Sequence, residues 1–190
     1  MKNNYGITAK LSQYFKRAIA DGKNISVGGS PHEEEQLDSV YIISDFIAVK
    51  IPALFYPAIA QGFTLRECPK PGESFIVSGR IQKTGAEWES FWSTFVKPCD
   101  SRAFPTPYSV EQDGCLLRIF TLNSEPLLIQ QKFLDCFEWT GLEFLACNNL
   151  SAVRAVGQFC EVLFQPMKSC ADSKSQAAIA KEFSAVHSLK

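Results

Sequence analysis

The residues that most often carry catalysis are few in this sequence, and their settings do not favour a reaction. The two histidines are His32, in a polar stretch, and His187, near the C-terminus. A Ser-His-Asp or Cys-His site needs an imidazole held in a pocket, which neither position suggests. Asp45 and Glu87 are isolated acids with no visible partner for acid–base work. We therefore expect no catalytic residues and a protein that binds rather than reacts.

Metal and cofactor sites are not indicated either. A structural zinc site needs paired ligands at short spacing, and the cysteines form no C-x-x-C pair. The run Glu33–Glu35 could hold a hard cation, but a charge run in a loop is usually only solvated. There is no Walker A loop and no G-x-G-x-x-G motif, and Gly28-Gly29 alone predicts loop geometry. We expect no metal and no cofactor.

The cysteine content bears on the compartment. An odd number of cysteines in a chain of 190 residues does not suit a small secreted disulfide scaffold. Reduced thiols in a cytosol are the simplest interpretation, with Cys136, Cys147 and Cys160 acting as small buried apolar residues. The first residues have no apolar signal-peptide core, and no segment approaches about 20 apolar residues. We expect a cytoplasmic protein without a membrane segment.

The charge is nearly balanced overall but uneven along the chain. The net charge of −1 and pI near 6.1 give no strong field for nucleic acid. The first helix, however, carries Lys10, Lys16 and Arg17 on the side away from its apolar residues. These are the candidate DNA contacts, since basic side chains bind phosphates. The alternative is an ordinary solvated helix face.

The spacing of apolar residues predicts the elements of the first half. Residues 7–20 have helical spacing, residues 24–38 form a loop, and 40–43 with 46–51 form a hairpin that turns at Ser44-Asp45. A helical turn between Pro52 and Pro57 and a strand at 74–80 follow. Residues 86–96 place Trp88, Phe91, Trp92 and Phe95 on one helix face, which is more typical of core than of a ligand platform.

The second half is predicted to be an antiparallel meander. An extended crossing at Pro98–Pro107 leads to a turn at Asp113-Gly114, a strand at 116–122 and a helix at 129–138. Strands at 142–147, 152–156 and 159–164 and a helix at about 174–186 complete the chain. Composition and length suit one domain, 1–190. We expect an α+β fold with a largely antiparallel sheet and two or more amphipathic helices.

Two stretches together resemble the bacterial DNA sliding clamp family, the beta subunit of polymerase III. The C-terminal half contains QKFLDCFE, FLACNN, LSAVRAV and FCEVLFQPMK in that order. This is similar to the helix, three strands and Pro-Met-basic ending of that family. YIISDFIAVKIP is similar to the family's strand, acidic turn and strand. The resemblance covers about half the chain.

The resemblance implies a clamp-like fold and binding functions. A clamp domain is a pair of β-α-β-β-β units, each with one helix facing a DNA channel, so residues 53–112 would be an insertion within a core of about 5–168. A clamp would also be a homo-oligomer, here from a phage or mobile element, with weak DNA contact. The family captures partner peptides in an apolar groove, and the segment that borders it corresponds to Gln165, Pro166, Met167 and Lys168. The alternative for Met167 is strand-end packing.

Two other classes of function stay open. One is an enzyme of unrecognised family with its site in the aromatic-rich middle segment, which a deep pocket of convergent polar groups would favour. The other is a self-assembling structural protein, which a sheet edge paired across a symmetry axis would favour.

Overall fold

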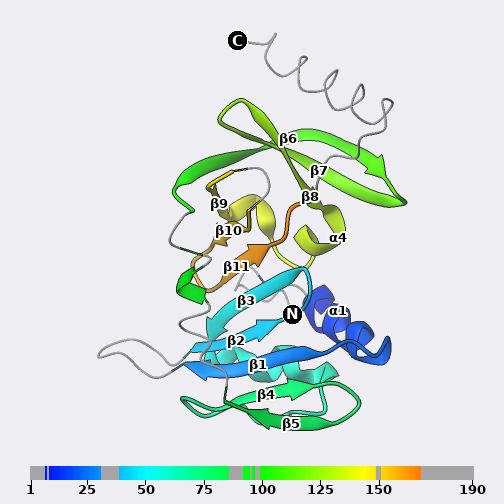
Figure 1. Cartoon of the computed structure of the whole chain (residues 1–190), viewed down its shortest axis with the longest axis vertical. Coiled ribbons are helices and arrows are strands. Elements are labelled where there is room, and N and C mark those ends of the chain that lie inside the picture. The colour runs from blue at the N-terminus through cyan, green and yellow to red at the C-terminus, as the bar shows by residue number, and fades with distance from the viewer. Residues whose placement is uncertain are drawn as a thin grey trace.

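A single antiparallel sheet of eleven strands forms the frame of the molecule (Figure 1). The computed structural model describes residues 7, 9–30, 39–85, 92–94, 96, 99–148 and 151–167. The strands run across the sheet in the order β5-β4-β1-β2-β3-β11-β10-β9-β6-β7-β8. They are β1 (Ile25–Ser30), β2 (Ser39–Ile43), β3 (Ile47–Pro52), β4 (Ser74–Val77), β5 (Ile81–Thr84), β6 (Ser101–Gln112), β7 (Cys115–Leu122), β8 (Glu125–Gln130), β9 (Glu143–Ala146), β10 (Val153–Val156) and β11 (Glu161–Phe164).

Helices are short and few in the described residues. The longest is α1 (Ala9–Ala20), and α4 (Gln131–Leu134) is a single turn. Between them in sequence, α2 (Tyr56–Ile59) is flanked by the 3₁₀ turns η1 (Ala53–Phe55) and η2 (Ala60–Gly62), and η3 (Trp139–Gly141) follows α4. The predicted α+β class with a largely antiparallel sheet is therefore confirmed. None of these helices is long and apolar enough to cross a membrane.

The centre of the sheet contains an internal repeat. The order helix, strand, strand, strand occurs as α1-β1-β2-β3 and again as α4-β9-β10-β11. The last strands of the two copies pair with each other, so the order β1-β2-β3-β11-β10-β9 is symmetric about the β3–β11 junction. Val49 pairs with Val162 at this junction. We call the copies the first and second repeat.

The hairpins of the two repeats have the same geometry. Ile43 pairs with Ala48 in the first repeat, and Val156 pairs with Glu161 in the second, so both turns are of equal length. The N–H of Ser44 donates to the carbonyl of Ile47 (2.9 Å), and the N–H of Gly157 donates to that of Cys160 (2.8 Å). The same bond at the same position of each turn supports a pseudo-two-fold relation between the repeats.

The two helices cover the same face of this sheet. Leu11, Phe15 and Ala18 of α1 recur at helical spacing and are buried in the main core, as are Phe133 and Leu134 of α4. The T-shaped contact of Tyr14 with Phe133 (ring centres 5.4 Å apart) joins the helices directly. In Figure 1 both helices lie to the right of β3 and β11.

A smaller cluster covers the opposite face. Trp92 is 4% exposed and packs with Tyr41, Ala48 and Leu163, its ring centre 5.3 Å from that of Tyr41. The expectation that this aromatic side chain is core is confirmed. The rest of the predicted aromatic stripe, Trp88, Phe91 and Phe95, lies outside the described residues, as do His32, His187 and the predicted helix at 174–186.

The loop predicted at 24–38 is wrong in its first part, because Gly28 and Gly29 lie inside β1. Each pairs with β2, and the segment around Lys70 crosses directly over Gly29. A Cβ on Gly29 would lie 2.4 Å from the carbonyl oxygen of Lys70. The glycine is therefore needed for close approach of two backbones and not for a turn.

Two elements of the second half also differ from the prediction. The crossing at Pro98–Pro107 is largely the long strand β6, in which the register with β7 shifts between Pro105 and Ser109, where prolines are tolerated. The helix predicted at 129–138 is the end of β8 and the single turn α4. The apolar residues that suggested the helix, Ile129, Phe133, Leu134 and Phe137, are all buried, but a short apolar run suits a strand as well as a helix. The remaining predicted hairpins and strands are confirmed within a few residues.

Candidate functional site

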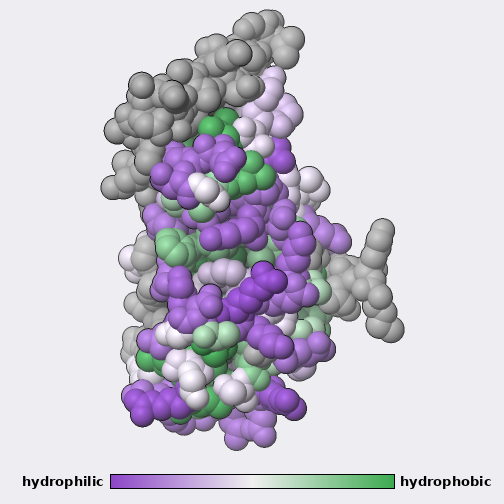
Figure 2. All heavy atoms as spheres, turned by 90° about the vertical axis from the view of Figure 1, so that its right-hand side faces the viewer, coloured by the Kyte–Doolittle hydropathy of each residue, from purple (hydrophilic) through white to green (hydrophobic). Residues whose placement is uncertain are grey.

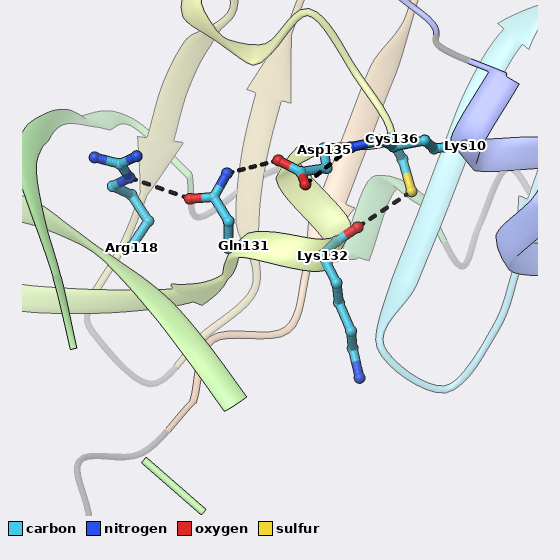
Figure 3. Close-up of polar contacts among 6 residues, drawn as sticks. All are labelled: Lys10, Arg118, Gln131, Lys132, Asp135 and Cys136. Atoms are coloured by element: carbon cyan, nitrogen blue, oxygen red, sulfur yellow. Dashed lines mark hydrogen bonds and ion pairs between the residues drawn. The ribbon is translucent and has the colours of Figure 1, made fainter. Parts of the chain in front are cut away.

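The face that carries α1 and α4 gathers polar side chains from both repeats. Nζ of Lys10 on α1 lies 3.1 Å from Oδ2 of Asp135, just after α4. Oδ1 of Asp135 accepts a hydrogen bond from Nε2 of Gln131 (2.7 Å), and Oε1 of Gln131 accepts one from Nε of Arg118 on β7 (3.2 Å). Figure 3 shows this row of contacts, which joins the two repeats across the face.

Asp135 is the central acceptor of this row. Burial alone would raise the pKa of its carboxyl group, but the hydrogen bonds from Gln131 and Lys10 and the charges of Lys10 and Arg118 hold the pKa below its ordinary value. The carboxylate is thus ionised near neutral pH and compensates Lys10. As a result, Lys10 contributes less free positive charge to the face than its sequence position suggested.

The other predicted DNA contacts are more available. Lys16 and Arg17 are exposed on α1, and no ion pair joins either to an acid in the described part of the chain. Lys132 on α4 is also exposed, and its ammonium lies 4.9 Å from the centre of the Phe133 ring. Viewed from this side, the surface is mainly hydrophilic (Figure 2). Asp21, just after α1, and Glu138, just before η3, are exposed acids, so the excess of positive charge is modest.

The structure describes three of the four predicted partner-groove residues, and these three have different surroundings. Gln165 is exposed, Pro166 is buried, and Lys168 lies outside the described residues. Met167 packs against Leu117, Ile119 and Leu128. Its N–H donates to the carbonyl of Leu128 (2.9 Å), and its Sδ accepts from Nε2 of Gln130 (3.1 Å). Both the backbone and the side chain of Met167 therefore pack against β8, which agrees with strand-end packing.

Gln165 instead borders a hollow of about 140 Å³ at the turn of the first hairpin. Phe46, in that turn, is 37% exposed, and its carbonyl accepts from the N–H of Gln165 (3.0 Å). The equivalent residue in the turn of the second hairpin is Phe159. Phe55 of η1 covers Phe159 with a T-shaped contact (ring centres 5.8 Å apart). The repeats therefore differ in what contacts this ring: Phe159 is contacted by Phe55, whereas Phe46 stacks on Phe133 and has Nζ of Lys23 5.4 Å from its ring centre.

A second hollow, of about 340 Å³, lies between β6 and the segment from η3 to β9. Its charged groups are Arg102 and Glu143, which bond to each other (Nε to Oε1, 2.6 Å). Among the described residues no group of three His, Cys, Asp or Glu side chains is placed to hold a metal ion. Neither hollow brings together the convergent polar groups that an enzyme site needs.

Sequence reasoning missed Gln131 and Arg118, which become neighbours only when β7 and α4 pack together. It also missed Phe46 as a surface residue. A phenylalanine stands at the same place in two turns of equal length, but this pattern does not predict exposure, because Phe159 at the equivalent position is contacted by Phe55. Comparison with protein-family models, characterised proteins and solved structures finds no significant match to this chain.

Proposed function

We propose that this chain is a non-enzymatic binding protein of the DNA-clamp-like kind, whose helix-bearing face contacts the phosphates of a nucleic-acid duplex. The observation that carries the proposal is the arrangement of the two repeats. Each contributes one helix to the same face, and that face bears Lys16, Arg17 and Lys132. Side-by-side helices on a repeated sheet also support the resemblance of the sequence to the sliding clamp family.

The charges predict that binding is weak. Each phosphate neutralised by a lysine or arginine releases counterions, so affinity falls steeply with salt. Three free cations, with Lys10 already paired to Asp135, predict a small number of such contacts. Retention on DNA would then depend on enclosing the duplex, and one chain of this size needs further copies to do so. We therefore propose a homo-oligomer, which light scattering would report as a multiple of the 21.2 kDa chain mass.

Charge reversal on α1 tests the proposed face. Lys16→Glu with Arg17→Glu is expected to abolish binding of a fluorescein-labelled duplex at low salt, measured by anisotropy. The matched control is Arg80→Glu with Lys83→Glu, which makes the same change of net charge at the β4–β5 hairpin. Reversing Lys83 replaces its ion pair with Glu73 by a like-charge contact, which costs little because Lys83 is well exposed to solvent.

Equal loss of binding in both double variants would contradict the proposal, because it would mean that only the overall charge matters. No binding of the unmodified protein to either a linear or a closed circular duplex would remove the DNA function altogether. If the protein is retained on closed circular duplexes and released when the circles are cut, this result would support a homo-oligomer that encloses the duplex as a ring.

The hollow beside Phe46 favours a second function, capture of a partner segment through an aromatic side chain. In the second repeat Phe55 packs on the equivalent aromatic side chain, Phe159, whereas the ring of Phe46 is 37% exposed beside the hollow. A synthetic peptide of residues 52–56 (PALFY) is therefore a rational probe. We expect it to shift the amide resonances of Phe46 and Gln165, whereas the same peptide with Phe55→Ala should not. Equal shifts with both peptides, or none with either, would exclude this function.

A further inference from the structure

Arg118 lies at one end of the polar row on the helix-bearing face, and its guanidinium is held from three sides. Nε donates to Gln131 (3.2 Å), and Nη1 donates to the carbonyl of Thr106 (3.3 Å). The guanidinium carbon lies 5.2 Å from the centre of the Trp139 ring. Because Gln131 is itself fixed by Asp135, the orientation of Arg118 is set before any ligand binds.

The charge of Arg118 is not balanced by an ion pair with any acid of the described chain. Its two hydrogen-bond acceptors are neutral, and Nη2 has no hydrogen-bond partner among the described residues. Asp135 stands one step further along the row, already bonded to Gln131 and Lys10. Arg154, the other half-buried strand arginine, is paired directly with Glu161. A positioned guanidinium with free donors suits the planar recognition of an oxyanion.

We infer that Arg118 binds a phosphate oxygen of the bound duplex, as a contact made from β7, beside α4 of the second repeat, in addition to those of α1. The inference rests on the proposed function and extends its contact surface from α1 across α4 to β7. The free Nη2 donates to the phosphate, while the bonds to Gln131 and Thr106 hold the group in place. Gln131 is then a positioning residue that acts through Arg118.

The salt dependence of duplex binding tests this contact. Arg118→Gln is expected to reduce the slope of log affinity against log salt by about 1, the loss of one phosphate contact. Arg118→Lys keeps the charge, so the slope should be retained. The affinity should fall, because lysine lacks the planar arrangement of N–H donors that the guanidinium group presents. Arg102→Gln is the matched control. Arg102 is also a strand arginine, but its neighbour Ala103 lies in the main core, so the side chain of Arg102 is on the opposite face of the sheet, where it bonds Glu143. A slope for Arg118→Gln equal to that of the parent would overturn the inference.

The Nε–H resonance of Arg118 separates this inference from the function on which it rests. The resonance is assigned by its loss in Arg118→Lys and is followed during titration with inorganic phosphate and with the duplex. Shifts with both support the inference. A shift with phosphate alone, in a protein that does not bind the duplex, would overturn the duplex contact and the proposed function together. Duplex binding on α1 without a shift of Arg118 would overturn the inference and leave the function standing.

Discussion

Val49 of β3 and Val162 of β11 face each other where the two repeats meet, and the strand order is the same on either side of them. Both side chains are fully buried beneath the helices. The junction is therefore part of one continuous core, which extends from α1 to α4. Disturbing the core at either helix should weaken the whole sheet rather than one half.

Phe133 is the aromatic side chain through which the helices meet, and its removal should be costly. The ring is 1% exposed and contacts Tyr14 and Phe46. We expect Phe133→Ala to lower the free energy of unfolding by about 3–5 kcal/mol, measured by urea denaturation. Phe104→Ala is the control, because that ring is 58% exposed and its loss should cost at most about 0.5 kcal/mol. Similar losses for the two variants would contradict the packing described here.

Gly29 should not tolerate a methyl group. Its position inside β1, where an added Cβ would meet the carbonyl of Lys70 at 2.4 Å, forces a shift of the backbone. We expect Gly29→Ala to destabilise the protein by about 1–3 kcal/mol, the usual cost of overpacking. Gly79→Ala is the control, since nothing lies within 4 Å of its added Cβ. A Gly29→Ala variant with the thermal midpoint of the parent would show that the Lys70 segment does not cross β1.

The thiols should differ widely in reactivity. Burial raises the pKa of Cys136 to about 12 and that of Cys160 to about 11, and the neighbouring acids Asp135 and Glu161 add to these shifts. Cys147, which sequence reasoning expected to be buried, is exposed at the end of β9. We expect iodoacetamide at pH 8 to label Cys147 before either buried thiol, as peptide mass spectrometry would show. Early labelling of Cys136 would contradict its burial.

The same shifts predict how stability depends on pH. A thiol whose folded-state pKa is raised keeps its proton above pH 9, whereas the thiol of the unfolded chain loses it. The unfolded state then binds fewer protons than the folded state. The contribution of these thiols to the free energy of unfolding should therefore be fully present below about pH 9 and should be lost between pH 9 and pH 12. Cys136→Ala should make this fall shallower in urea titrations at several pH values. An unchanged pH dependence would show that Cys136 does not titrate as its burial implies.

Local patterns in the sequence predicted the helices and strands better than they predicted which residues pack against one another. The spacing of Leu11 and Phe15 and the turn at Ser44-Asp45 were sufficient for α1 and for the first hairpin. By contrast, Gly29 is explained by Lys70, and Met167 by Leu128, contacts between residues far apart in the chain. Two repeated units were expected only from the resemblance to a clamp domain and not from the residue pattern itself, because the repeat is preserved in hairpin register and helix placement and much less in residue identity.

The candidate site was predictable only in part, for the same reason. Lys16 and Arg17 could be placed on an exposed helix face from spacing alone. The ion pair of Lys10 could not be predicted in this way, because its partner Asp135 comes from the other repeat. Arg118 lies on a strand, where a single arginine carries no signal until Gln131 and Trp139 are placed beside it.

A map of backbone amide shifts in the isotope-labelled protein, recorded on addition of a short DNA duplex at low salt, would show directly whether the two helices bind the duplex. The contact surface proposed here predicts that the largest shifts fall in α1 around Lys16 and Arg17 and in residues 131–135. Shifts should be absent from the β4–β5 hairpin and from Tyr41 and Leu163 on the opposite face. Shifts confined to that opposite face, or no shifts at all, would contradict the claim that this protein binds a duplex through its two helices.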